Sequence, residues 1–289
     1  VVVREFSRDD LSAAMLTASV YAVLLFSLAV VSAAPSPQRA RADRARRPKA
    51  TGYVDYLNST GLNVILSAPH GGSLSPSEIP DRDAGCWDGN DCIWSHDCGQ
   101  KDFDNCAATT VKDLNTEELA RELHQALCDR FSQCPGTVIN LLHREKLDAN
   151  REVNEATFGV PLAVDAYNEF QDYIIAERNN LGSRMGLYID LHGHGHSIQR
   201  AELGYLVSGS DLDSGDAIDP ATTSIRSLAN HVGGVFDDLL RGATSFGHYM
   251  EVEGFRAVPS PADPGPDGNS YFSGGYNTQV HGSRDGGVV

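Results

Sequence analysis

The stretch LNVILSAPHGG, residues 62–72, indicates the fold class of this chain. It begins with a mainly apolar run without strict alternation, which is typical of a strand that is buried on both faces of a sheet. Pro69 then fixes the backbone and the two glycines permit a sharp turn, so His70 is presented where the strand ends. A second stretch, GLYIDLHGHGH at residues 186–196, has the same design, because a buried run again ends at a histidine.

Apolar runs alternate with helical patterns along the rest of the chain. Further strands are predicted at residues 137–143 and 203–209, and helices at residues 115–127, 164–177 and 222–240. Such alternation favours a sheet with helices on both faces. We therefore expect an α/β fold with a mixed, largely parallel sheet, forming one domain over residues 51–289. Ligands of such sheets bind beyond the carboxyl ends of the strands.

The composition is that of an acidic globular protein. The chain has 289 residues, 41% of them hydrophobic, and 39 acidic against 23 basic residues give a formal net charge of −16. The hydrophobic fraction excludes wholesale disorder. An acidic body repels phosphate backbones, which argues against a nucleic-acid partner.

The first fifty residues are predicted to direct the chain to its compartment. Residues 1–33 are interpreted as a leader and a signal peptide, because an apolar run follows Met15 and ends in small residues. A membrane anchor is the alternative, since the run approaches the length of a spanning helix. The basic residues 34–50 are interpreted as a solvated linker or as a propeptide with processing at Arg47. We expect a secreted protein with no membrane span once the signal is removed.

The cysteines agree with export. All six lie within residues 86–134: Cys86, Cys92, Cys98, Cys106, Cys128 and Cys134. An even, clustered set in an oxidising compartment predicts disulfides. Cys128 and Cys134 are expected to pair across a helix end, and the other four to form two bridges in a loop over residues 86–106. A zinc knuckle is the alternative for this loop. Asn58 is a candidate glycosylation site in a secreted chain.

The strand-end histidines, His70 and His192, are candidate metal ligands. One such histidine alone could be a hydrogen-bonded structural residue, but two in one sheet favour a shared ligand. A zinc site needs a third ligand, usually a carboxylate, and one open position. The candidates for this carboxylate are Glu78, Asp81, Asp83 and Asp113. Asp113 could also be only the N-terminal cap of the following helix.

Two arginines follow the predicted strand at residues 137–143. Arg144 and Arg151 would lie at the same edge of the sheet as the histidines, where paired guanidinium groups suit a substrate carboxylate. A salt-bridged surface loop is the alternative.

Several motifs occur together in a fixed order. They are PHGG at residues 69–72, D-x-x-T-x-x-L from Asp113, R-x-x-x-D-x-N-R from Arg144, DLHGH at residues 190–194, F-x-G-G-Y from Phe272, and HGSRDGG at residues 281–287. The set resembles the N-formylglutamate amidohydrolase family, relatives of zinc carboxypeptidases and aspartoacylases. The resemblance covers roughly residues 62–289. It implies a zinc exopeptidase-like (phosphorylase/hydrolase-like) fold, one Zn²⁺ per chain, and hydrolysis of a small amide next to a free carboxylate.

The resemblance also implies roles for single residues. His70, Asp113 and His192 are expected to bind zinc, although the carboxypeptidase pattern would place a glutamate at Ser73. Asn150 and Arg151 correspond to the pair that holds the substrate carboxylate. Further expected substrate contacts come from Arg144, which is also expected to take part in catalysis, from His194, and from Tyr276 as a catalytic residue that closes over the substrate.

One departure affects the expected activity. Members of the family continue after the glycine-rich segment into a strand with Gln-x-Glu, whose glutamate is the expected general base. This chain ends at Val289, so we interpret it as truncated at its C-terminus. Glu251 and Glu253 could replace the base only if their loop turned inward. The favoured hypothesis is therefore a secreted zinc amidohydrolase acting on an N-acyl amino acid or small peptide, and the alternative is a secreted acidic pseudoenzyme or binding protein.

Overall fold

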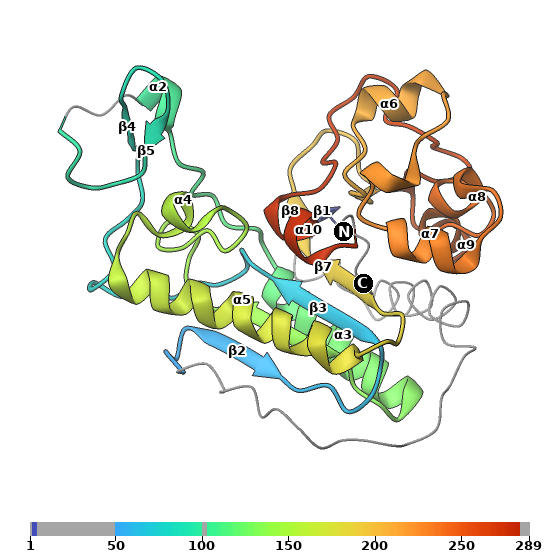
Figure 1. Cartoon of the computed structure of the whole chain (residues 1–289), viewed down its shortest axis with the longest axis horizontal. Helices are drawn as coiled ribbons and strands as arrows, with labels where there is room; N and C mark the ends of the chain where they lie inside the picture. The colour runs from blue at the N-terminus through green and yellow to red at the C-terminus, as the bar shows by residue number, and fades with distance from the viewer. Residues whose placement is uncertain (1, 5–49, 100–102, 284–289) are drawn as a thin grey trace.

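The computed structural model describes residues 2–4, 50–99 and 103–283. The predicted leader, signal peptide and basic linker lie outside these residues, except for Val2–Arg4, which form strand β1. The chain is a mixed α/β protein with two four-stranded sheets and one small hairpin among its described residues (Figure 1).

The first sheet carries the strand predicted from residues 62–68. Its order is β2 (Val54–Leu57), β6 (Gly136–Asn140), β3 (Val64–Ala68) and β7 (Leu187–Asp190). Strands β6 and β7 run parallel to β3, whereas β2 is antiparallel to β6. All five residues of β3 are buried. This sheet confirms the expected mixed, largely parallel arrangement and brings the carboxyl ends of β3, β6 and β7 to one edge.

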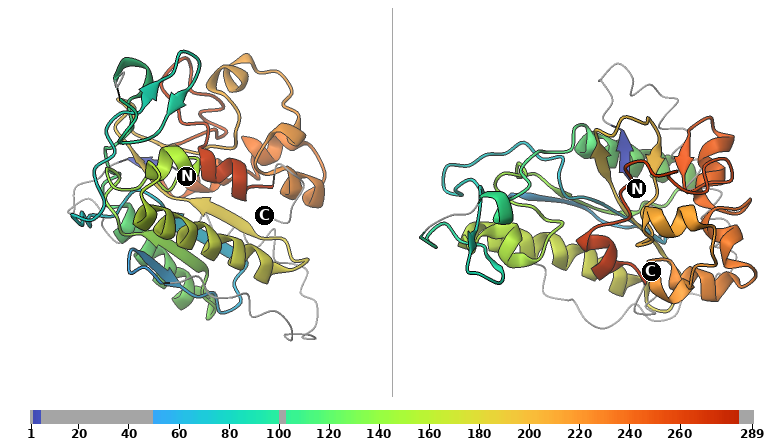
Figure 2. Two further views of the ribbon diagram at one scale, coloured as in Figure 1. Left: turned by 60° about the vertical axis from the view of Figure 1, so that its left-hand side comes forward. Right: turned by 90° about the horizontal axis from the view of Figure 1, so that it is seen from above.

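Two long helices cover opposite faces of this sheet (Figures 1 and 2). The helices are α3 (Thr116–Phe131) and α5 (Pro161–Leu181). Alternate β3 side chains face different helices, because Val64 and Leu66 belong to the core cluster of α3 whereas Ile65 belongs to that of α5. The predicted helices at residues 115–127 and 164–177 are thus present, and each is longer than its pattern indicated.

The second sheet continues from the first through Leu191. Its order is β10 (Ala257–Val258), β9 (Ala201–Glu202), β1 and β8 (His192–His194), with β1 parallel to β8. The predicted strand at residues 203–209 is wrong. The strand ends at Glu202, because Leu206 adopts a positive φ of 64° and Ser208 caps the next helix.

The predicted helix at residues 222–240 is also wrong as one element. It is divided into η1 (Pro220–Thr222), α7 (Arg226–Val232) and α8 (Phe236–Leu240). The division occurs because Gly233 and Gly234 both adopt positive φ, which ends a helix readily at glycine. With α6 (Gly209–Ser214) and α9 (Phe246–Val252), these elements form a layer of short helices at one end of the molecule (Figure 1).

A disulfide-bonded lobe projects from the other end (Figure 1). It contains the hairpin of β4 (Cys86–Trp87) and β5 (Cys92–Ile93) and the short helix α2 (Phe103–Cys106). Its bridges join Cys86 to Cys98 and Cys92 to Cys106, and the expected bridge joins Cys128 to Cys134. All three predicted disulfides are therefore present. Within the described ranges, no helix is both long and apolar enough to cross a membrane.

Candidate metal centre and substrate cavity

A cavity of about 470 Å³ lies where β3, β6 and β7 end. Its volume falls in the usual range of small-molecule sites, roughly 300–1,000 Å³. Both arginines and four further predicted site residues, His70, Asp113, Asn150 and His192, line it. The other lining residues are Thr109, Asp190, Gly193, Gly204, Phe272, Gly274, Gly275 and Thr278.

Three of the lining side chains form a compact triad. The Nδ1 atoms of His70 and His192 are 3.1 Å apart, and Asp113 Oδ2 lies 3.3 Å from the first and 3.0 Å from the second. Two ligands of a tetrahedral zinc ion with bonds near 2.0–2.1 Å are roughly 3.3 Å apart. The triad therefore has the spacing of three zinc ligands, and all three residues line the cavity. The other carboxylate candidates, Glu78, Asp81 and Asp83, are exposed outside it.

The two glycines of PHGG allow this convergence. A Cβ atom on Gly72 would lie 2.2 Å from the Leu141 carbonyl carbon, and one on Gly71 would lie 2.4 Å from the Glu117 nitrogen. The chain after β3 can thus pass between the end of β6 and the start of α3. The Asp113 amide then donates to the His70 carbonyl oxygen at 3.1 Å, which places the Asp113 carboxylate beside the ring.

The second nitrogen of each imidazole faces its own carboxylate. His70 Nε2 lies 2.6 Å from Asp148 Oδ1, and His192 Nε2 lies 2.7 Å from Asp190 Oδ2. A neutral imidazole that donates from Nε2 exposes its lone pair on Nδ1. In their neutral form, both rings would therefore direct a lone pair at the centre of the triad, and such carboxylate partners are usual for metal-binding histidines. Sequence reasoning gave no role to Asp148 and Asp190, although each precedes a candidate residue by two positions.

The charges of the site are strongly coupled. Burial alone would raise the pKa of Asp113, but its bonds to His192 and His70 hold that pKa well below its usual value. For His192, burial lowers the pKa, but the carboxylates of Asp190 and Asp113 outweigh it and raise the pKa to about 9. At neutral pH the His192 ring therefore carries a second proton and a positive charge, unless a bound metal cation takes the place of that proton.

Both arginines are anchored by hydrogen bonds and line the cavity. Arg144 donates from Nε to Asp148 at 2.9 Å and from Nη1 to the Val111 carbonyl at 3.2 Å. Arg151 donates from Nε to Glu155 at 3.0 Å and from Nη1 to the Asn150 carbonyl at 2.9 Å. Among the described residues no partner binds either Nη2 group. These two amino groups can therefore receive an anion.

Two residues that the sequence did not single out hold these loops. Arg82 is fully buried and donates to the carbonyls of Thr109, Arg144 and Glu155 at 2.7, 2.8 and 3.0 Å. Burial lowers the pKa of Arg82 to about 10, so it remains charged. Asn277, on α10 (Tyr276–His281), donates from its backbone to Asn150 Oδ1 at 2.7 Å.

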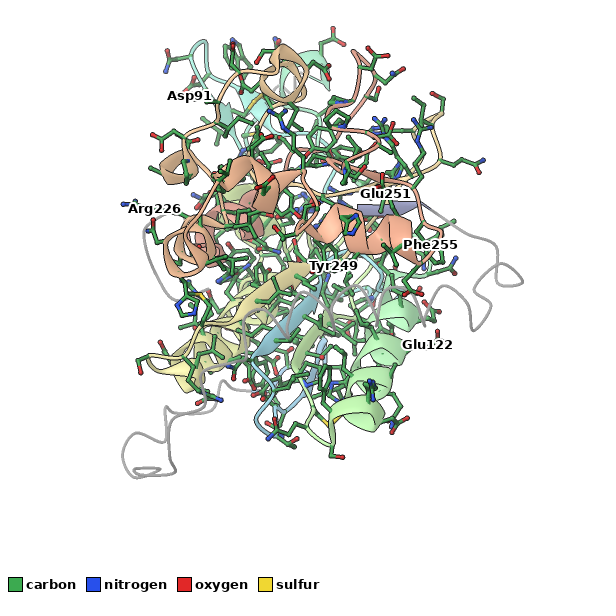
Figure 3. The ribbon with its side chains drawn as sticks, turned by 90° about the vertical axis from the view of Figure 1, so that its right-hand side faces the viewer. Asp91, Glu122, Arg226, Tyr249, Glu251 and Phe255 are labelled. Atoms are coloured by element: carbon green, nitrogen blue, oxygen red, sulfur yellow. A yellow bond between two sulfur atoms is a disulfide. The ribbon has the colours of Figure 1, made fainter. Side chains whose placement is uncertain are left out.

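Four residues considered in the sequence analysis lie elsewhere. Tyr276 does not close over the cavity, because its ring packs in the α5 core cluster and interacts with Tyr167. His194 is buried and does not line the cavity, because its Nε2 donates to the Arg200 carbonyl at 2.9 Å. Glu251 lies on α9 among the C-terminal helices (Figure 3), where it accepts a hydrogen bond from Ser260 at 2.5 Å. Glu253, which caps the end of α9, is likewise outside the lining.

Two other groups of potential ligands occur among the described residues. His124, Cys128 and Cys134 lie close together, but the two sulfur atoms form a disulfide and are not thiolate ligands. His194, His196 and Glu202 form the other group. The protein matches no family model, no curated protein and no solved structure in the comparisons made.

Proposed function

We propose that this protein is a secreted zinc-dependent amidohydrolase of the N-formylglutamate amidohydrolase type, with a zinc exopeptidase-like fold. Its substrate is a small amide next to a free carboxylate, such as an N-acyl amino acid. The observation that carries the proposal is the triad of His70, Asp113 and His192 at ligand spacing inside a cavity that two arginines line.

The donor set suits zinc. Two neutral imidazoles and one carboxylate, with an open fourth side, are a frequent ligand set of catalytic zinc. When bound, zinc polarises a substrate carbonyl and lowers the pKa of water, which is the chemistry that amide hydrolysis requires. Asp148 and Asp190 orient the two rings, and Asp113 supplies the negative charge that favours a divalent cation.

The arginines supply the substrate preference. Arg144 and Arg151 line the same cavity as the triad, and two guanidinium groups bind a carboxylate well. A free carboxylate bound there lies beside the metal centre, so the neighbouring amide is the bond exposed to hydrolysis. Export is supported by the three disulfides, which persist in oxidising compartments.

The proposal is tested with the purified full chain. We expect about one zinc per chain by elemental analysis, and release of a free amino acid from an N-acyl amino acid. His192→Ala should lose both zinc and activity, whereas His231→Ala, at the end of α7, should retain both. Stable protein that binds no zinc at micromolar concentrations would overturn the proposal.

A binding protein without turnover is the second candidate. Among the described residues, the carboxylates that line the cavity are Asp113 and Asp190, and both are already held by site partners. No lining carboxylate is thus free to accept a proton from water. Zinc binding and carboxylate binding with no hydrolysis of any N-acyl amino acid would favour this candidate.

A further inference from the structure

The cavity has an aromatic wall that the proposed reaction does not explain. Phe272 lines it and is 48% exposed, which places it among the exposed large apolar residues of the described part of the chain. The neighbouring lining positions are the small residues Gly204, Gly274 and Gly275. This side of the cavity therefore presents one aromatic ring beside uncharged backbone.

A buried hydrogen-bond network fixes Phe272 in this position. Glu202 is fully buried, and its Oε2 accepts a hydrogen bond from the Phe272 amide at 2.8 Å. Its other oxygen, Oε1, lies 3.0 Å from His196 Nδ1. The His196 ring stacks on the Phe272 ring with centroids 4.5 Å apart and 20° between the planes. The position of the Phe272 ring is thus fixed both by the hydrogen bond of its backbone amide and by the stacking of its ring face on His196.

The same hydrogen-bond network accounts for the close approach of His194, His196 and Glu202 without a bound metal. His194 Nδ1 accepts a hydrogen bond from the His196 amide at 3.2 Å, so its lone pair is engaged. Arg200 Nε lies 3.8 Å from Glu202 Oε1 and supplies a positive charge that opposes a second cation. These contacts assign the group a supporting role for Phe272.

We propose that Phe272 forms an apolar subsite that selects amides with an aromatic acyl group. This inference rests on the proposed function. Arg144 and Arg151 hold the carboxylate of the amino acid, and the triad lies at the amide bond. The acyl group would then lie against the uncharged part of the cavity lining, where the Phe272 ring can stack on an aromatic acyl group. The preferred substrate class is therefore N-aroyl amino acids rather than N-formyl or N-acetyl amino acids.

Hydrolysis and binding are measured separately to test the subsite. For the zinc-loaded protein we compare kcat/KM for N-benzoylglycine and N-formylglycine, and we measure Kd for N-benzoylglycine by calorimetry after substitution of zinc by an inert metal. A stacked aromatic pair contributes about 0.5–1.5 kcal/mol beyond its buried area, which is roughly two- to tenfold in affinity. Phe272→Ala should therefore weaken N-benzoylglycine binding by about two- to tenfold and lower its kcat/KM similarly, with N-formylglycine changed less than twofold.

Two variants of His196 test whether its stacking supports the Phe272 ring. His196→Ala should give an intermediate loss of benzoyl preference, and His196→Phe should restore it, because a stacked ring is present again. Trp87→Ala is the matched control, since Trp87 is similarly exposed, at 43%, but lies outside the cavity lining.

The outcomes distinguish the two proposals. Phe272-dependent binding of N-benzoylglycine without hydrolysis overturns the amidohydrolase and retains the subsite. Hydrolysis that is equally fast for both substrates, or unaffected by Phe272→Ala, overturns the subsite and retains the amidohydrolase.

Discussion

The two imidazoles of the triad are used in the same way, although they come from distant parts of the chain. Each directs Nε2 to a buried carboxylate and Nδ1 to the common centre. The orientation of each ring is therefore fixed before a cation arrives, and a bound cation would take the place of the second proton of His192. A site whose ligands need little reorganisation binds metal more tightly, so the carboxylates behind the rings should matter almost as much as the ligands.

Asp148→Asn tests this expectation at the fully buried partner of His70. The substitution retains an oxygen acceptor but removes the charge that strengthens the bond to the ring and to Arg144. Zinc affinity should fall by about 10- to 100-fold. Competition with a chelator of known affinity measures the change. Asp91→Asn, in the exposed disulfide lobe, is the control, and equal affinities of the two variants would contradict the orienting role.

The raised pKa of His192 predicts a pH dependence of metal binding. Its pKa of about 9 exceeds the ordinary value of 6.5, so at pH 7 zinc must displace one proton. Between about pH 6.5 and pH 8, the apparent affinity should rise with pH by up to about tenfold per unit, since one proton is released per ion. Calorimetry in buffers of different ionisation enthalpy counts that proton, and binding at pH 7 without proton release would refute the assignment.

The same shift affects stability in the metal-free protein. A pKa raised above its unfolded value stabilises the fold below pH 6.5, and this stabilisation is lost as pH rises through about 9. Melting of the chelated protein should therefore fall in temperature from pH 6.5 to pH 9. His192→Gln, which does not titrate, removes this part of the pH dependence.

At the scale of elements, the site depends on how closely the turn after β3 approaches its neighbours. Gly72→Ala would place a Cβ atom 2.2 Å from the Leu141 carbonyl carbon, so the end of β6 must move. We expect a loss of about 3 kcal/mol in the free energy of unfolding, together with weaker zinc binding. Urea unfolding provides the measurement. Gly195→Ala is the control, because no atom lies within 4 Å of its added Cβ, and it should change stability by less than about 0.5 kcal/mol.

Elements with a continuous pattern could be predicted, and elements set by single backbone angles could not. The buried run around β3 and the apolar stripe of α3 gave correct elements, because the pattern of polar and apolar side chains indicates which faces of an element are buried. The strand at residues 203–209 failed because Leu206 adopts a left-handed conformation, which only its tertiary surroundings require. The prediction of one helix over residues 222–240 was wrong, although Gly233 and Gly234 are residues that commonly end helices.

The candidate site could likewise be predicted only in part from the sequence. The strand-end position of His70 and His192 follows from local sequence, so their meeting could be predicted. The roles of Asp148, Asp190 and Asn277 depend on side-chain directions across the sheet, which no spacing reveals. Tyr276 was misplaced because an aromatic residue beside glycines fits both a lid and a core, and packing against α5 decided between them.

At the scale of the whole molecule, the proposed export predicts a glycan that can be measured. Asn58 is exposed in the turn after β2, followed by Ser59 and Thr60. Expressed with its own N-terminal segment in eukaryotic cells, the protein should appear in the medium with one glycan at this position. Endoglycosidase should shift its mobility, and Asn58→Gln should abolish that shift. Retention of unglycosylated protein in the cytosol would contradict a secreted enzyme.

The cavity is assembled from two stretches of chain with separate tasks. The metal triad and the arginines lie between residues 70 and 192, whereas the wall at Phe272, Gly274 and Gly275 comes from the loop before α10. Substitutions in that loop can alter which molecules enter while the reactive centre stays intact. Exchange of a few residues after position 270 should thus change the ligand preference of this protein without changing its proposed metal ligands.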